Sequence, residues 1–227
     1  AFTQEDLDRV RDKLGLTGPY PVQYARWLGN FFVGDFGTSW SNHRPVLDRM
    51  LPRILVSFEL GVLAGMISIT MGLILGVTAA VRRDTWVDYV FRSVSMSLQA
   101  MPGFWLALMT IVTLVAVFDW IPPIKFAHLT DDPVRNISVL LLPAFLTGLR
   151  STAEILRMTR SSVLEVLHED YVRTANSKGL GRRKVLYGHV LRNALLPVTT
   201  LAGFEVVFLM SGQIILEQIF NIPGIGK

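Results

Sequence analysis

Long apolar runs alternate with short charged segments from residue 54 onward. Residues 54–81 contain a single charged side chain, Glu59, and as a helix they would extend about 42 Å, which exceeds the roughly 30 Å hydrocarbon core of a bilayer. We predict three further spans on the same grounds, at about 89–118, 137–156 and 193–216. The pattern therefore predicts an all-α membrane protein with four spans in this chain.

The second and third predicted spans are less regular than the first. Ser93 to Phe118 carries no charge, but Pro102-Gly103 interrupts it, and we expect a kink there because proline removes a backbone donor. The uncharged part of the third span is shorter, covering only residues 136–149. It is followed by Arg150 and Glu154, which we expect to form an i, i+4 pair near the water interface.

Three polar side chains within these spans are candidates for a translocation pathway. Glu205 is the one charged residue in 193–216 and lies near its middle, which predicts a position close to the bilayer centre. A charge in hydrocarbon is costly, so it should face protein or water, where a carboxylate would attract the amino terminus of a peptide. Gln99 and Gln213 offer similar polar groups. A structural alternative, with Glu205 protonated or bonded to a partner subunit, is equally open at this point.

Small residues form a stripe along the first predicted span. Gly61, Gly65, Gly72 and Gly76, with Ser68 among them, follow one another at intervals of four, three, four and four residues. Such a stripe lets a second helix approach closely in lipid. We predict that these glycines form a helix-packing face, although glycine also occurs in membrane helices without such a role.

The charges of the loops predict the orientation of the chain. Lys and Arg accumulate in cytoplasmic loops. Here they concentrate at 82–92 and at about 157–192, whereas 119–135 holds two basic and three acidic residues. We therefore predict that 1–53 is an extracytoplasmic segment and that 54–227 is a transmembrane domain whose inner loops are 82–92 and 157–192.

The segment before the first span is polar and rich in loops. A short helix is predicted from Pro21, and the two glycines in 34–40 indicate an irregular connection. An amphipathic pattern near the start predicts another short helix, with a cap at Thr3 and Asp6 followed by apolar Leu7, Val10 and Leu14.

The inner segment 157–192 is too long for a simple connection and contains a capped short helix. Glu169 and Asp170 begin this helix, and Lys178 followed by Gly179 ends it, which suits the helix dipole and the preference for glycine just past a helix end. The stretch 182–197 is predicted to be an interfacial helix that leads into the last span. A capped helix across the inner ends of the spans is a lever that a soluble partner can hold.

These residues resemble the cytoplasmic "EAA" loop of permease subunits of ATP-binding-cassette importers, in particular the dipeptide and oligopeptide type. Arg173-Thr174-Ala175 stands where the general importer pattern has Glu-Ala-Ala, and Leu196-Pro197 comes later than in sugar importers. Both departures match the peptide-permease variant, and the stretches 34–39 and 220–226 are similar to that type as well. By this resemblance, a coupling helix docks on an ATPase subunit through Asp170, Tyr171, Val172, Arg173, Thr174, Ala175, Lys178 and Gly179.

The resemblance also implies partners and a location. It implies a multi-pass permease of the bacterial cytoplasmic (inner) membrane, paired with a second homologous permease, two ATP-binding subunits and an extracytoplasmic solute-binding protein. The family has six spans, so one further span is expected before residue 1 and one after residue 227. The permease would bind no cofactor, since ATP and Mg are used by its partners. Dipeptides, oligopeptides, nickel complexes, glutathione and oligosaccharides are all candidate solutes.

Composition agrees with a membrane chain and excludes other classes. The chain is 51% hydrophobic and 18% charged, with net charge +4, mean hydropathy +0.42 and no cysteine, which excludes disulfides, Cys-bound zinc and thiol catalysis. Residues 179–184 lack the spacing of a phosphate-binding loop, and His43, His128, His168 and His189 lack metal-binding spacing. We predict no catalytic or metal site and no enzyme. A secondary transporter or channel subunit that works without an ATPase is the main alternative.

Overall fold

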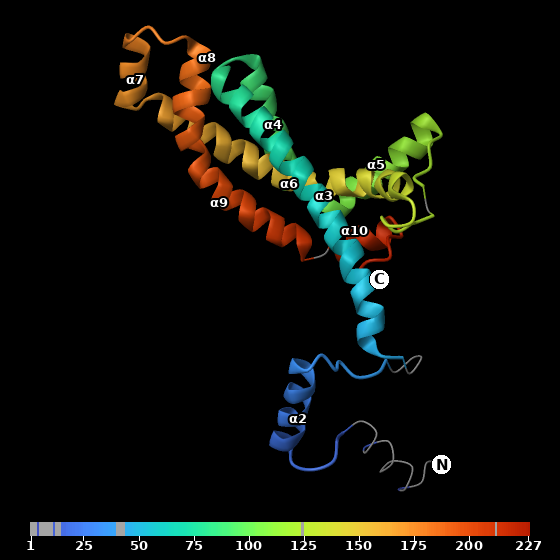
Figure 1. Ribbon diagram of the computed structural model, residues 1–227. Coiled ribbons are helices and arrows are strands. Elements are labelled where there is room, and N and C mark those ends of the chain that lie inside the picture. Colours follow the sequence, from blue (N-terminus) through green and yellow to red (C-terminus); the bar gives the residue numbers. More distant parts are fainter. Residues whose placement is uncertain (1–3, 5–10, 12–14, 40–43, 124, 212) are drawn as a thin grey trace. The chain divides into compact units, whose positions relative to one another are not determined.

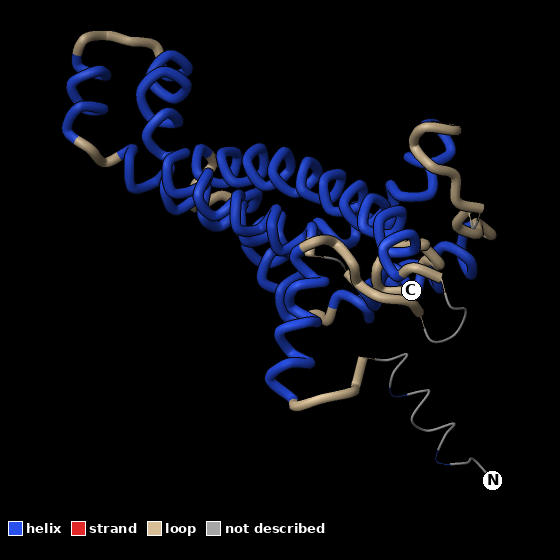
Figure 2. Tube along the Cα trace, turned by 60° about the horizontal axis from the view of Figure 1, so that its bottom comes forward, coloured by secondary structure: helices blue, strands red, loops and turns tan. Residues whose placement is uncertain are grey.

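The described part of the chain folds almost entirely into helices (Figures 1 and 2). It contains no strand, and its one isolated β-bridge joins Thr38 to Pro45. The chain divides into two compact units, Ala1–Pro52 and Arg53–Lys227. The residues described by this computed structural model are 4, 11, 15–39, 44–123, 125–211 and 213–227.

The first unit contains helix α2 (Tyr20–Phe32), which is the helix that the sequence predicts from Pro21. None of its residues is buried, and its aromatic side chains contact one another instead. The ring centroid of Trp27 lies 5.9 Å from that of Tyr24 and 5.8 Å from that of Phe31. These contacts give α2 an apolar aromatic edge.

The connection after α2 is irregular, as the two glycines predict. Gly34 and Gly37 have φ angles of +84° and +73°, which glycine adopts without strain. The Asp35 carboxylate accepts a hydrogen bond from the Gly37 N–H at 2.9 Å, which stabilises the turn. The other predicted short helix, with Leu7, Val10 and Leu14, lies outside the described residues.

Helix α3 (Val46–Val81) contains the first predicted span and is the longest described helix. It begins eight residues before Ile54, with Asp48 in its first turn, where an acidic side chain suits the helix dipole. At 1.5 Å per residue its 36 residues extend about 54 Å. The helix is therefore long enough to cross a bilayer and continue beyond it.

The second predicted span is two helices. α4 (Trp86–Ala100) and α5 (Gly103–Phe118) are bent by 107° at the break between them, so the interruption lies at Pro102, where the sequence predicts a kink, and is sharper than a kink. Met101 is extended, with φ −88° and ψ 132°, because a residue before proline is excluded from the helical region. Pro102 then caps α5. The pair is either a broken span or a re-entrant loop by its length and composition.

Helix α6 (Pro133–Leu167) extends past both ends of the predicted third span. Asp132 caps its start by accepting a hydrogen bond from the Arg135 N–H at 3.0 Å. Its second half stays helical because it is amphipathic and buries residues such as Leu156 and Val163 against neighbouring helices. Arg150 is thus the middle residue of a 35-residue helix and does not mark its end.

The segment predicted as an inner loop and last span is also mostly helical. α7 (Asp170–Ser177) is separate, whereas α8 (Arg182–Val185), the π-helical turn η1 (Leu186–Val190) and α9 (Leu191–Met210) form one continuous helix. The last helix ends six residues before the predicted end of the span at Leu216, since α9 ends at Met210 and a short helix, α10 (Ile214–Ile219), follows polar Ser211 and Gln213. Three described helices, α3, α6 and α8–α9, are long and apolar enough to cross a membrane, and the α4–α5 pair is a possible fourth span.

The glycine stripe of α3 lies against α6 and α9. A Cβ atom on Gly72 would stand 2.6 Å from Ile155 Cγ2, and one on Gly76 would stand 2.6 Å from Thr159 Cβ. Toward the other end of α3, a Cβ on Gly61 would stand 2.8 Å from the Met210 Cα atom, and one on Gly65 would stand 3.2 Å from a Val206 methyl group. The helices therefore touch at backbone distance, as in other membrane bundles packed through small residues.

We expect Gly72→Ala to destabilise the second unit by about 1 to 3 kcal/mol, since the added methyl group has no space against Ile155. Gly203→Ala in α9 is the matched control, because nothing lies within 4 Å of its added Cβ and both changes gain the same helix propensity. Thermal unfolding of the full-length protein in detergent measures both. Equal midpoints for the two variants would contradict close packing at Gly72.

Candidate functional site

Helix α7 has the short, capped form that the sequence predicts. Asp170 lies in its first turn, and Gly179 follows Lys178 with a φ angle of +77°. The Gly179 N–H donates to the Asn176 carbonyl oxygen at 2.9 Å, which satisfies one of the free carbonyl groups at the helix end. A left-handed glycine therefore turns the chain from α7 toward α8.

One face of α7 is fixed to the bundle and the other is exposed. Val172 and Ala175 are buried in an apolar cluster with residues of α3, α6 and the α8–α9 helix. Asn193, near the start of α9, donates a hydrogen bond to the Tyr171 hydroxyl at 2.7 Å. Figure 1 shows α7 beyond the end of α6 and next to α8. The remaining predicted coupling residues are exposed: Asp170, Tyr171, Arg173, Thr174, Lys178 and Gly179.

An ion pair that sequence reasoning missed ties α4 to α6 near α7. Arg160 Nε and Nη2 donate to the two Asp88 oxygens at 2.6 and 2.7 Å, and the Asp84 N–H also donates to Asp88 at 3.1 Å. The Asp88 side chain is completely buried and that of Arg160 is 18% exposed. The two residues are 72 positions apart in the sequence, and each resembles the charged residues that commonly lie at a membrane interface. No sequence pattern therefore points to the pair.

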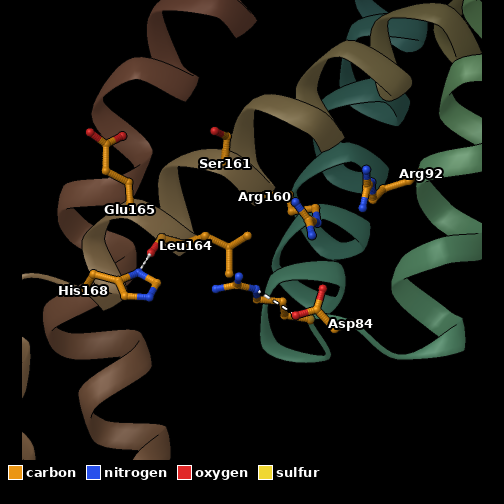
Figure 3. Close-up of a pocket in the computed structure, with 8 residues that line it drawn as sticks. Asp84, Arg92, Arg160, Ser161, Leu164, Glu165 and His168 are labelled. Carbon is orange, nitrogen blue, oxygen red and sulfur yellow. Dashed lines mark hydrogen bonds and ion pairs between the residues drawn. The ribbon is translucent and has the colours of Figure 1, made fainter.

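Beside this ion pair is an open cavity of about 540 Å³ (Figure 3). Its charged side chains are balanced: Arg83 pairs with Asp84 at 3.1 Å, Arg160 pairs with Asp88, and the remaining lining charges are one arginine, Arg92, and one glutamate, Glu165. His168 Nδ1 lies 2.6 Å from the Leu164 carbonyl oxygen, which holds the ring at the end of α6. The cavity therefore has little net charge with which to attract an ion.

A second polar cluster joins α6 to α9. The Ser151 hydroxyl donates to a Glu205 carboxylate oxygen at 2.5 Å, and Glu205 also interacts electrostatically with Arg150 and Glu154. The position of Glu205 differs from the prediction, since α9 ends only five residues later, at Met210. Its partner Ser151 nevertheless lies next to the midpoint of α6, within a helix long enough to cross the membrane.

One of the three predicted pathway residues, Gln213, shares a cavity with the hydrogen-bond partner of another. Gln213 and Ser151 line the same cavity of about 110 Å³, between the α4–α5 break, α6, α9 and α10, and Ser151 donates to Glu205, which does not itself line the cavity. Gln99 is not among the lining residues, and its side-chain nitrogen is buried without a hydrogen-bond partner in the described chain. The predicted i, i+4 pair of Arg150 and Glu154 is present, with Arg150 Nε 3.6 Å from a Glu154 oxygen, and Arg150 lines this cavity as well.

The end of the described chain carries a buried polar contact that also went unpredicted. Glu217 in α10 is completely buried, and its carboxylate accepts hydrogen bonds from the Ser57 hydroxyl at 2.7 Å and the Gly226 N–H at 2.8 Å. Ser57 in turn accepts from the Ile225 N–H at 2.9 Å. A Cβ atom on Gly224 would collide with the Glu217 carboxylate. The turn over residues 220–226 thus needs its glycines to close over this acid.

The sequence of this chain matches a known family of transport proteins. Residues 72–227 match the family model of the binding-protein-dependent transport system inner membrane component. The chain belongs to this family. The matched region includes α7, the Asp88–Arg160 pair and the polar cluster around Glu205.

Individual relatives of this permease support the assignment. An oligopeptide transport system permease protein of Bacillus subtilis is 36% identical over 229 residues, which cover 100% of this chain and 72% of the relative. A dipeptide transport system permease protein of Escherichia coli K12 is 35% identical over 238 residues, covering 95% and 70%. A Brucella suis protein named for a peptide transport system is 38% identical over 223 residues, covering 98% and 71%.

Membership of this family establishes the location and the general role of the chain. It is a multi-pass component of the inner membrane and a permease subunit of an importer, which is a transport component and not an enzyme. It works with other components of a binding-protein-dependent transport system.

We expect Asp88→Asn to destabilise the permease by about 3 kcal/mol, because Arg160 keeps its charge in a largely buried site without the carboxylate. The control is Asp84→Asn, which breaks the exposed pair with Arg83, whose side chain is 51% exposed, and should change stability by less than about 1 kcal/mol. The midpoint of thermal unfolding in detergent compares them. Similar shifts in both variants would show that the buried pair has no special weight.

Glu217→Ala should also destabilise the permease, by about 1 to 3 kcal/mol for each donor left without an acceptor, namely the Ser57 hydroxyl and the Gly226 N–H. Its neighbour Gln218 provides the control, since Gln218→Ala removes an exposed hydrogen bond to the Gly226 carbonyl oxygen. Limited proteolysis of the full-length permease reads out the order of this segment. If both variants resist the protease as the parent does, the Glu217 contacts do not hold the turn.

Proposed function

We propose that this permease forms part of the translocation pathway for peptides or similar small polar solutes and is driven by ATP-binding subunits through α7. The observation that carries the proposal is the two-sided character of α7. Val172 and Ala175 anchor it to the bundle, while Asp170 and Arg173 on its other face are exposed and charged. A partner that binds the exposed face would move a helix that is already fixed to the spans.

A continuous helix leads from α7 toward the polar cluster. α6 ends three residues before α7 begins and runs without a break to Ser151 and beyond. From Leu167 back to Ser151 it covers about 24 Å at 1.5 Å per residue. A displacement of α7 would therefore reach the residues around Glu205 through one rigid element, with the Asp88–Arg160 pair carrying it to α4.

The proposal assigns ATP binding and solute delivery to other subunits. The chain has no phosphate-binding loop, so ATP and Mg would be bound by two ATP-binding subunits. A second homologous permease would complete the pathway, with Glu205 and Gln213 facing it or the solute, and an extracytoplasmic solute-binding protein would deliver the solute. Relatives named for dipeptide and oligopeptide transport support peptides as the solute class.

Gly179→Val tests the coupling role, because a β-branched residue is strained by about 1 to 2 kcal/mol at a φ of +77° and would tilt α7. The matched control is Gly181→Val, since Gly181 has a φ of −61° and nothing lies within 4 Å of a Cβ at either position. We expect ATP-dependent peptide uptake into proteoliposomes to fall several-fold for Gly179→Val alone.

Two outcomes would contradict the proposal. The ATP-binding subunits should co-purify with the parent permease, and their absence from it would refute the proposal. Uptake equal to that of Gly181→Val would show that the shape of α7 is not important for coupling.

A further inference from the structure

Arg150 is a charged residue within a helix that is otherwise apolar enough to cross a membrane. It is the middle residue of α6. An ionisable residue within a membrane-crossing helix is by default a candidate for function, because it must face protein or water wherever the helix lies in hydrocarbon. Its side chain is nevertheless 67% exposed in this subunit, so the chain's own fold does not enclose it.

The partners of Arg150 leave most of its donors free. Its one ion pair is with Glu154, and Arg150 Nε lies 3.6 Å from the nearest Glu154 oxygen, which is too long for a hydrogen bond. Within the described residues the guanidinium has no hydrogen bond to a side chain or carbonyl group. Arg160 on the same helix is the contrast, since a buried carboxylate binds two of its nitrogens.

Two carboxylates accompany this cation. Glu154 lies one turn further along α6, and Glu205 reaches the same region from α9, held there by the Ser151 hydroxyl. Glu205 interacts electrostatically with both Arg150 and Glu154. The cavity next to the cluster is lined by Arg150, Ser151 and Gln213. One cation and two anions therefore lie together at mid-helix, on a surface that has space beside it.

We propose that Arg150 and Glu205 form a binding site for the two charged termini of a peptide in transit. The Arg150 guanidinium would bind the peptide's carboxylate with two parallel hydrogen bonds, a geometry that suits this pair of groups. Glu205, with Glu154 nearby, would accept hydrogen bonds from the ammonium group. This site rests on the proposed transport of peptides and adds to it the chemistry that the permease recognises.

The neighbours of Arg150 would allow the site to release its ligand. Each terminus of the peptide would meet its opposite charge, while Glu154 competes with the peptide's carboxylate for Arg150. That competition keeps the binding weak, which a translocation pathway requires.

The test uses the full-length permease in its complete transporter in proteoliposomes, with the dipeptide Ala-Phe, its C-terminal amide and its N-acetyl form as probes. Each probe is supplied at a concentration that saturates the solute-binding protein, and uptake by each variant is divided by uptake by the parent. The matched control for Arg150→Gln is Arg157→Gln, which changes an exposed arginine two turns further along α6 that lines no part of the cavity.

We expect Arg150→Gln to lower uptake of Ala-Phe about tenfold and uptake of its amide by less than twofold, with Arg157→Gln changing neither. Glu205→Gln should lower uptake of Ala-Phe several-fold more than uptake of the N-acetyl form. Equal losses for all three probes, unchanged uptake, or loss of assembly with the partner permease in Arg150→Gln would each overturn the site. Failure of the parent itself to take up Ala-Phe with ATP would instead refute the proposed function.

Discussion

The second unit depends on the close approach of α3 to α6 and α9, which the glycines of α3 permit. In lipid no hydrophobic effect drives helices together, so their association rests on van der Waals contact and on polar bonds between them. The close approach of backbones at Gly61, Gly72 and Gly76 supplies the van der Waals contact. It also sets the distances at which the polar pairs form, because Ser57 lies four residues before Gly61 and reaches Glu217 only when α3 lies close to the end of the chain.

The polar pairs form a second layer of specificity on this packed frame. Asp88 with Arg160 joins α4 to α6, Ser151 with Glu205 joins α6 to α9, and Ser57 with Glu217 joins α3 to α10. Each pair is removed from water wholly or in part, so a shifted register would leave polar groups without partners. Helix α6 takes part in two of the three pairs and is continuous between them. Helix α6 is therefore the element best suited to couple the movements of distant parts of the permease.

The sequence predicted what depends on local pattern and missed what depends on distant partners. Apolar length and capping residues placed α3, α6 and α7, and the residues of the inner loop pointed to the family. The same reasoning missed the end of α9 at Met210, because apolar residues continue beyond it, and it placed the break at Pro102 without its 107° angle. Glu217 and Asp88 could not be recognised because their partners lie 160 and 72 positions away.

The contact between Ser57 and the turn at Ile225 also bears on the order of folding. These residues are 168 positions apart, and at roughly 5 to 20 residues per second their synthesis is separated by about 10 to 30 s. For that time α3 can sit in the membrane, but the hydroxyl of Ser57 has no native partner and the apolar cluster around Leu60 lacks Phe220 and Ile222. The nascent permease therefore passes through a state in which this part of the core is open, and the core closes only after the turn over residues 220–226 has been made.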